Sequence, residues 1–310
     1  MVVKKRNSMP RNWRARVRDY CAVLVTAILC IQSVFAQSIS TTAELATQLD
    51  GFRSDAWFLP DDDMLGFVPI PEGSFPMGSN PLIDPMAFEN ERWSETRRQG
   101  IVELPDYYIS RFEVTTAQFA AFVEATNYRA DPQSQEQALN YPAAYVSWTD
   151  AVAYSRWLDS ALRELAFLPP PLREFLDQGA HVTLPNEAEW EKAAKGSDGR
   201  IYPWGNQMQS QRANIASGGT LPVGSFTCPE CLFDLADMSG NVWEWTRSAY
   251  QEYPFDSTNN RVNLSEDALW VIRGGSYNDE GNNARAAVRG AADPGARRPF
   301  IGFRVVISKQ

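Results

Sequence analysis

Histidine is almost missing from this chain of 310 residues, which contains only His181. A single imidazole excludes a metal centre built from several histidines, including the triad of two histidines and a carboxylate. His181 precedes a short apolar stretch typical of a strand, so we expect an ordinary surface or hydrogen-bonded histidine. Long apolar runs are missing too. The longest, residues 21–36, is shorter than the ~20 residues of a membrane-spanning helix.

The composition excludes several classes of protein. The chain is 44% hydrophobic and 22% charged, without an internal repeat, so it is neither collagen-like nor a coiled coil nor largely disordered. Residues 1–36 carry seven Lys or Arg and one Asp, whereas residues 37–310 carry 22 basic and 37 acidic residues. Such an acidic body argues against nucleic acid or an anionic membrane surface as the partner.

The amino terminus has the order of a secretory signal. Basic residues precede the apolar run of residues 21–36, and Val34 and Ala36 place small residues where a signal peptidase reads. We therefore predict cleavage after Ala36, a periplasmic or secreted chain, and no membrane span after cleavage. An uncleaved anchor is the alternative, and Met9 is as plausible a start as Met1.

Cysteine is scarce and unevenly placed. Cys21 and Cys30 lie in the predicted signal, which leaves Cys228 and Cys231 in a Cys-Pro-Glu-Cys loop. In an oxidising compartment this spacing predicts a small disulfide that fixes a loop. A redox-active pair and two free thiols remain alternatives.

The remaining chain reads as a polar lead-in over residues 37–66 and one α+β domain over residues 67–310. Strand patterns cover residues 67–79 and 107–114, and helices begin at Thr115, near Thr149 and at Asn186. Asn186 and the Glu three residues later form a predicted capping box. Residues 169–171 are three prolines, which we expect to end the second helix. Beyond Gly196 the patterning indicates turns and short strands with little regular structure.

Eight sequence blocks match one family in order. They are PEGSFPMGS (71–79), RFEVTTAQFAAFV (111–123), YPAAYVSWTDAVAYSRWL (141–158), LPNEAEWEKAAKG (184–196), YPWGN (202–206), ADMSGNVWEWT (236–246), RGGSY (273–277) and IGFRVV (301–306). With these blocks the chain resembles the sulfatase-modifying-factor, or formylglycine-generating-enzyme, superfamily. The resemblance implies a single domain related to C-type lectins, low in regular secondary structure and stabilised by Ca²⁺.

A calcium site is expected in the tryptophan-rich turn at residues 237–244. Two carboxylates and two main-chain carbonyls within eight residues suit a hard cation with oxygen ligands. The resemblance implies Asp237, Gly240, Val242 and Glu244 as its ligands. It implies a second, weaker site at Asn214 and Ile215. A metal-free loop tied by hydrogen bonds of Asn241 and Trp243 is the alternative.

The copper centre of the family is not expected here. Formylglycine-generating members hold Cu(I) with two cysteines after the Gly-Gly-Ser motif, because Cu(I) requires soft thiolate ligands. The first of these positions matches Asp279, and the second falls near Asn283 and Ala284. We therefore predict no copper and no copper-dependent formylglycine activity.

The resemblance also implies a substrate groove in the same region. Its expected lining comprises Trp243, Ser276, Tyr277, Asn278, Asp279 and Arg289, with Arg285 at its flank. Asp279 is a weak candidate for a general base or metal ligand, as is Glu280. For the arginines, including Arg304, a role as buried donors to loop carbonyls is the favoured interpretation.

Three functions remain open. The first is a binding, accessory or regulatory protein, resembling the periplasmic activators of type VI secretion phosphorylation, with a protein or peptide partner and a monomeric state. The second is a copper-independent periplasmic modifying enzyme, similar to the relative that matures the siderophore pyoverdine. The third is a residual role in sulfatase maturation.

Overall fold

The computed structural model describes residues 49–56, 58–94, 99–256 and 268–310. The chain divides into two units, Met1–Asp50 and Gly51–Gln310. The first unit lies almost wholly outside the described residues, as does the predicted signal peptide at residues 1–36. Within the described part of the chain, we find no helix of the length and apolarity needed to cross a membrane.

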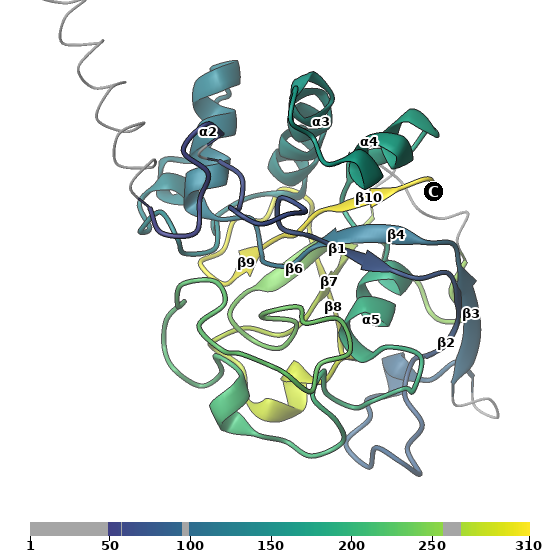
Figure 1. Ribbon diagram of the computed structural model, residues 1–310. Coiled ribbons are helices and arrows are strands. Elements are labelled where there is room, and N and C mark those ends of the chain that lie inside the picture. Colours follow the sequence, from purple (N-terminus) through teal and green to yellow (C-terminus); the bar gives the residue numbers. More distant parts are fainter. Residues whose placement is uncertain (1–48, 57, 95–98, 257–267) are drawn as a thin grey trace, which may run out of the picture. The chain divides into compact units, whose positions relative to one another are not determined.

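The second unit contains three small sheets (Figure 1). An antiparallel sheet has the order β1 (Phe67–Ile70), β4 (Tyr107–Ser110), β10 (Val306–Ser308), β5 (His181–Thr183). A hairpin-like pair joins β2 (Gly73–Met77) to β3 (Gly100–Leu104). The third sheet has the order β8 (Arg289–Ala292), β7 (Trp270–Arg273), β6 (Trp243–Ala249), β9 (Ile301–Gly302), with β6 and β9 parallel.

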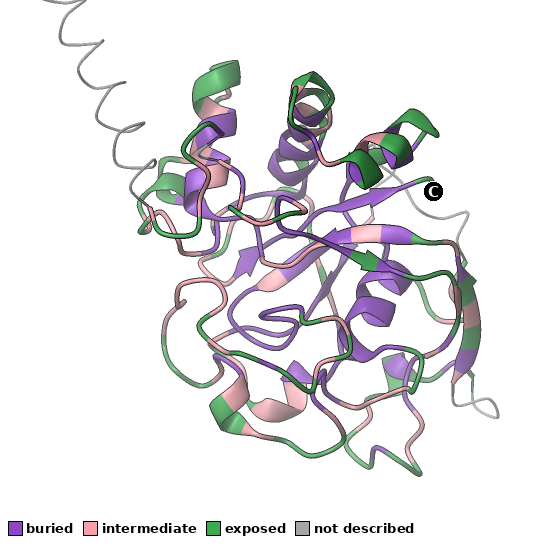
Figure 2. Ribbon diagram, viewed as in Figure 1, coloured by how far each residue is buried: buried purple, intermediate pink, exposed green. Residues whose placement is uncertain are grey.

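Four α-helices accompany these sheets: α2 (Thr116–Thr126), α3 (Trp148–Glu164), α4 (Pro170–Asp177) and α5 (Glu187–Lys195). Short 3-10 turns are η1 (Glu89–Glu91), η2 (Pro132–Gln135), η3 (Ser210–Arg212) and η5 (Gly281–Ala284). Helices α2, α3 and α4 lie together beyond the first sheet, with exposed outer faces (Figures 1 and 2). The mixture of helix and strand confirms the expected α+β fold.

The predicted helix starts are confirmed by their caps. Thr115, Ser147 and Asn186 are the N-cap residues of α2, α3 and α5, and each belongs to a capping box. The prediction missed α4, because the three prolines at 169–171 were read only as a helix end. Pro170 stands at the first position of α4, where the missing amide hydrogen costs nothing.

Helix α5 is the most enclosed element of the unit. All nine of its residues are buried, and it packs between β2 and β3 on one side and β6 and β7 on the other (Figure 2). Trp190 is fully buried, and its indole Nε1 donates to Glu244 Oε2 at 2.7 Å. This helix therefore joins the hairpin to the strand that carries the tryptophan-rich turn.

The compact unit begins at Gly51, whereas the sequence placed the start of the domain at residue 67. The earlier start follows from Ala56, Leu59 and Leu65, which are buried in the same core cluster as Phe67. Half of the predicted lead-in is therefore packed structure.

Candidate functional site

A tight turn after β7 positions the predicted groove residues. Gly274 and Gly275 have positive φ angles of 100° and 72°. A Cβ atom on Gly275 would lie 2.7 Å from the carbonyl oxygen of Asn283, so a side chain there would collide with the backbone. The glycines thus bring Ser276 and the following residues against η5.

Asp279 is the centre of this turn. Its Oδ2 accepts hydrogen bonds from Trp243 Nε1 at 2.9 Å and from the Ser276 amide and hydroxyl at 3.0 and 2.6 Å. Its Oδ1 accepts from Asn283 Nδ2 at 3.2 Å. A carboxylate with four donors is well suited to hold a turn, and it would lose these bonds if it took a proton as a general base.

The structure brings together three of the predicted groove residues, namely Trp243, Ser276 and Asp279. Tyr277 is half-buried and is fixed through its backbone amide, which donates to the Asn241 carbonyl at 2.9 Å. Asn278 is exposed at the tip of the turn. The part of this region open to a partner is therefore small and is centred on Asn278.

Arg289 lies apart from these residues. Its guanidinium donates to both carboxylate oxygens of Glu187, at 2.5 and 2.8 Å, and to the carbonyls of Asn90 and Gln251. It also stacks over the ring of Tyr253, 3.9 Å from the centroid. None of these partners is a predicted groove residue.

The other singled-out arginines are buried in the same way. Arg285 donates to Asp84 at 2.6 Å and to both oxygens of Glu91 at 2.7 Å. Arg304 donates to both oxygens of Glu244, at 2.6 and 2.7 Å, and to main-chain carbonyls. This geometry agrees with buried arginines whose hydrogen bonds and ion pairs join separate loops.

The tryptophan-rich turn is also shaped by backbone constraints. Asp237 and Gly240 have positive φ angles of 57° and 83°, and a Cβ on Gly240 would lie 2.4 Å from the carbonyl oxygen of Asn214. Asp237 Oδ2 accepts from the Gly224 amide at 2.7 Å. Glu244, at the start of β6, is fully buried between Arg304 and Trp190.

Glu113 joins this turn, although the sequence analysis did not identify it. It follows β4, is fully buried, and accepts hydrogen bonds from Asn241 Nδ2 at 2.6 Å and from the Val242 amide at 3.2 Å. Burial raises the pKa of Glu113 well above its usual range, and the neighbouring Asp237 and Glu244 raise it further. Burial likewise raises the pKa of Asp237, to about 6. Arg304 lies close enough to all three carboxyl groups to interact with each, although the three do not converge as a metal-binding group.

The second predicted cation site is already hydrogen-bonded within the protein. Asn214 donates through Nδ2 to Asn241 Oδ1 and to the Gly219 carbonyl, both at 2.9 Å, and its backbone carbonyl accepts from the Asn241 amide. Ile215 is half-buried beside the Tyr202 and Trp204 cluster. Among the described residues, no three His, Cys, Asp or Glu side chains converge as a metal-binding group.

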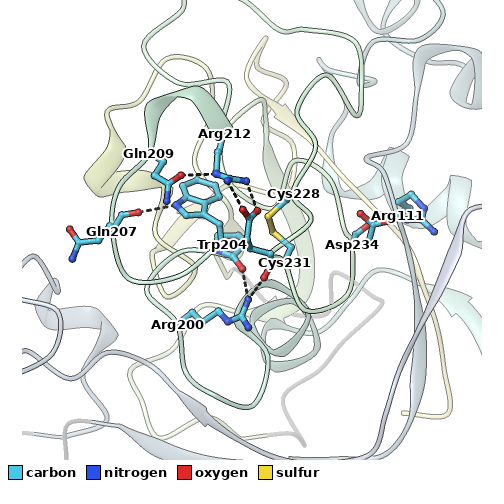
Figure 3. The surroundings of a disulfide bond; sticks show 11 residues. Arg111, Arg200, Trp204, Gln207, Gln209, Arg212, Cys228, Cys231 and Asp234 are labelled. Atoms are coloured by element: carbon cyan, nitrogen blue, oxygen red, sulfur yellow. Dashed lines mark hydrogen bonds and ion pairs between the residues drawn. A yellow bond between two sulfur atoms is a disulfide. The ribbon is translucent and has the colours of Figure 1, made fainter.

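Cys228 and Cys231 form a disulfide, as the sequence predicted (Figure 3). Glu230, between them, makes a bidentate ion pair with Arg212 at 2.6 and 2.7 Å, and its carbonyl accepts from Arg200 at 2.6 Å. Trp204, stacked on Tyr202, packs in the same cluster. The cross-link and two arginines therefore hold this loop against the YPWGN turn.

Residues 59–309 match the model of the sulfatase-modifying factor enzyme 1-like domain. The chain belongs to this family.

Among its relatives, the formylglycine-generating enzyme of Thermomonospora curvata is 28% identical over 315 aligned residues, which cover 79% of this chain and 94% of the relative. The inactive C-alpha-formylglycine-generating enzyme 2 of Mus musculus is 30% identical, with 78% and 85% covered. The solved structure of PvdO from Pseudomonas aeruginosa superposes with a TM-score of 0.60 at 25% identity, covering 78% of this chain and 93% of PvdO. The family and the fold expected from the sequence are therefore confirmed.

Proposed function

We propose that this chain is an extracytoplasmic family member without copper-dependent formylglycine activity that works as a binding, accessory or regulatory protein. One observation carries the proposal: Asp279 stands at the expected cysteine position, with its carboxylate committed to Trp243, Ser276 and Asn283. In the described part of the chain, both cysteines are joined in a disulfide. Cu(I) would find carboxylate and amide oxygens there in place of thiolates.

The relative of Mus musculus named as inactive supports the view that the scaffold can persist without this activity. A copper-independent modifying enzyme, like the relative that matures pyoverdine, is the second candidate. The extracytoplasmic location rests on the signal-like residues 1–36 and agrees with the disulfide.

We also propose that Ca²⁺ is bound at the tryptophan-rich turn. Carboxylate and carbonyl oxygens are the ligands that a hard divalent cation prefers, and Asp237 and Glu244 are both buried in this turn. The residues that would hold it are Asp237 and Glu244, with the carbonyls of Gly240 and Val242. Bound there, it would fix an irregular turn against β6.

The copper part of the proposal is tested with the chain beginning at Gln37, incubated with Cu(I) and a sulfatase-derived cysteine peptide. We expect no aldehyde, with the Thermomonospora curvata enzyme as the positive control. The matched variant is Asp279→Cys with Asn283→Cys, because the side chains of Asp279 and Asn283 already touch at 3.2 Å. This variant should gain Cu(I) binding that the unmodified chain lacks. Aldehyde formed by the unmodified chain would overturn the proposal.

The partner is tested by a photo-crosslinking residue placed at the exposed Asn278 in the native cell. We expect a protein or peptide adduct at this position and none with the same residue placed at Glu164, on the outer surface of α3. Turnover of a small molecule, lost in Asp279→Asn without an adduct, would favour the enzyme instead.

A further inference from the structure

A cavity formed by described residues lies away from Asp279, between η1 and the segment that follows β6. It has a volume of about 660 Å³. Its lining comprises Glu89, Asn90, Arg92, Trp93, Ser94, Tyr250, Glu252 and Tyr253. The residues named for the groove, the tryptophan-rich turn and the disulfide loop do not contribute to it.

The walls of this cavity are fixed in place from beneath. Arg289, on β8, donates to the carbonyl of the lining residue Asn90 at 3.1 Å and to the carbonyl of Gln251, which lies between the lining residues Tyr250 and Glu252, at 2.9 Å. The Asn90 side chain in turn donates to the Tyr250 hydroxyl at 3.4 Å. A cavity tied across its floor in this way needs little reorganisation to bind a ligand.

Aromatic rings form its apolar surface. Trp93, only 8% exposed, packs against Tyr253 with ring centroids 5.1 Å apart, and Tyr250 completes the group. Arg289 lies under Tyr250 and Tyr253, at 5.0 and 3.9 Å from their centroids. Its charge is compensated by Glu187, so it does not dominate the field in the cavity.

The acidic side chains at the rim of the cavity make few contacts within the protein. The Glu89 side chain is 93% exposed and reaches Arg92 only at 3.9 Å. Glu252 is exposed, and we find no hydrogen bond or ion pair from its carboxylate to any described residue. Arg92 also lines the cavity, so the carboxylates of the lining exceed its basic side chains by one. Aromatic faces next to such carboxylates are surroundings that favour ammonium and guanidinium groups.

We propose that this cavity docks a segment of a partner protein that carries lysine or arginine side chains. A basic side chain would lay its aliphatic stem along the aromatic walls and place its charge at Glu252 and Glu89. The excess of acidic residues over residues 37–310 would steer such a segment toward this chain. The proposal is independent of any chemistry at Asp279.

The test is calorimetric titration of the folded chain beginning at Gln37 with a capped Lys-Ala-Lys-Ala-Lys peptide, its glutamate counterpart and spermidine. We expect the lysine peptide to bind, more weakly as salt rises, and the glutamate peptide not to bind. The double variant Glu89→Gln with Glu252→Gln should weaken binding about tenfold, since two exposed ion pairs are lost. Glu164→Gln, an exposed change on α3, is the control and should leave binding unchanged.

Both variants alter only exposed carboxylates, so their folding should be normal and is checked by thermal melting. Absence of lysine-peptide binding, or binding that survives the double variant, would overturn the proposal. Spermidine that binds as tightly as the peptide would overturn the assignment to a protein segment.

Discussion

Buried arginine side chains explain how a fold with so many loops stays ordered. Arg273, Arg285 and Arg304 are fully buried, and each one joins carboxylates to main-chain carbonyls, one for Arg285 and three each for Arg273 and Arg304. A guanidinium with five donors can satisfy loop carbonyls that no strand partner reaches. The sequence shows the arginines but not their carboxylate neighbours, Glu91, Glu113 and Glu191. Those contacts join residues that lie far apart in the chain.

Replacing Glu244 by Gln removes the charge that faces Arg304 without changing the volume. Arg304 then loses its direct ion pair and keeps only Glu113 and Asp237 as more distant acidic neighbours, so the free energy of unfolding is expected to fall by about 3–5 kcal/mol. Urea denaturation measures this loss, with Glu164→Gln as a control that should stay within about 0.5 kcal/mol. A loss that small for Glu244→Gln would contradict the role given to the pair.

Asp279 is expected to matter for stability through its turn. Asp279→Ala removes the acceptor of four hydrogen bonds and leaves the Trp243 indole and Ser276 without their partner. The expected loss is about 1–3 kcal/mol, measured by urea denaturation. An unchanged midpoint would instead place Asp279 free at a surface groove.

His181 provides a pH test, since it is the one histidine in the chain. Although His181 is exposed at the start of β5, partial desolvation and the nearby Arg247 lower the pKa of its imidazole below the usual value of 6.5. The folded state therefore binds the proton less readily than the unfolded state, and His181 contributes stability above pH 6.5 that is lost as the pH falls through its folded pKa. An NMR titration should show one imidazole with a midpoint below 6.5, and a midpoint above it would contradict the packing around β5.

The residues at which the helices begin could be predicted from the sequence, but how deeply a helix is buried could not. The capping boxes at Thr115, Ser147 and Asn186 are local and follow from a few adjacent residues. Helix α5 carries five charged residues, which from sequence alone is typical of a surface helix. It is buried because Lys192 and Lys195 donate to carbonyls of the β1–β2 connection and of Gly78, which lie more than 100 residues away.

Glu191 should be the most sensitive position of α5. It accepts from Lys195, Arg273 and the Gly78 amide, at 2.6, 2.6 and 2.7 Å, and it is fully buried. Glu191→Gln leaves the buried Lys195 without its ion-pair partner and Arg273 with only Glu187, 3.5 Å away, so a loss of about 3–5 kcal/mol or failure to fold is expected. The exposed neighbour Glu174→Gln on α4 is the control. Near-native stability of Glu191→Gln, measured by thermal and urea unfolding, would show that the network is dispensable.

At the scale of the whole molecule, regular sheets account for little of the candidate site. The groove turn, the tryptophan-rich turn and the disulfide loop are all irregular, and each is held by contacts between segments far apart in the chain. Sequence blocks such as RGGSY and GNVWEW indicated these turns through the family resemblance. The cavity lined by Trp93, Tyr250 and Glu252 could not be predicted in this way, since its two walls meet only in the folded chain.

The disulfide is expected to stabilise the molecule modestly. It closes a loop of four residues, for which the chain-entropy estimate is about 2 kcal/mol. The variant Cys228→Ser with Cys231→Ser should therefore stay folded with a slightly lower melting temperature, because Arg200 and Arg212 still hold Glu230. Global unfolding of this variant would give the disulfide a larger role.

The central claim is that a hard cation holds the tryptophan-rich turn while the copper position has lost its soft ligands. The most direct measurement is elemental analysis of the chain beginning at Gln37, purified without chelator, together with melting in Ca²⁺ and in EGTA. The account predicts stoichiometric calcium, no copper, and a lower melting temperature in EGTA for the unmodified chain but not for Glu244→Gln. Stoichiometric copper, or a melting temperature indifferent to calcium, would contradict it.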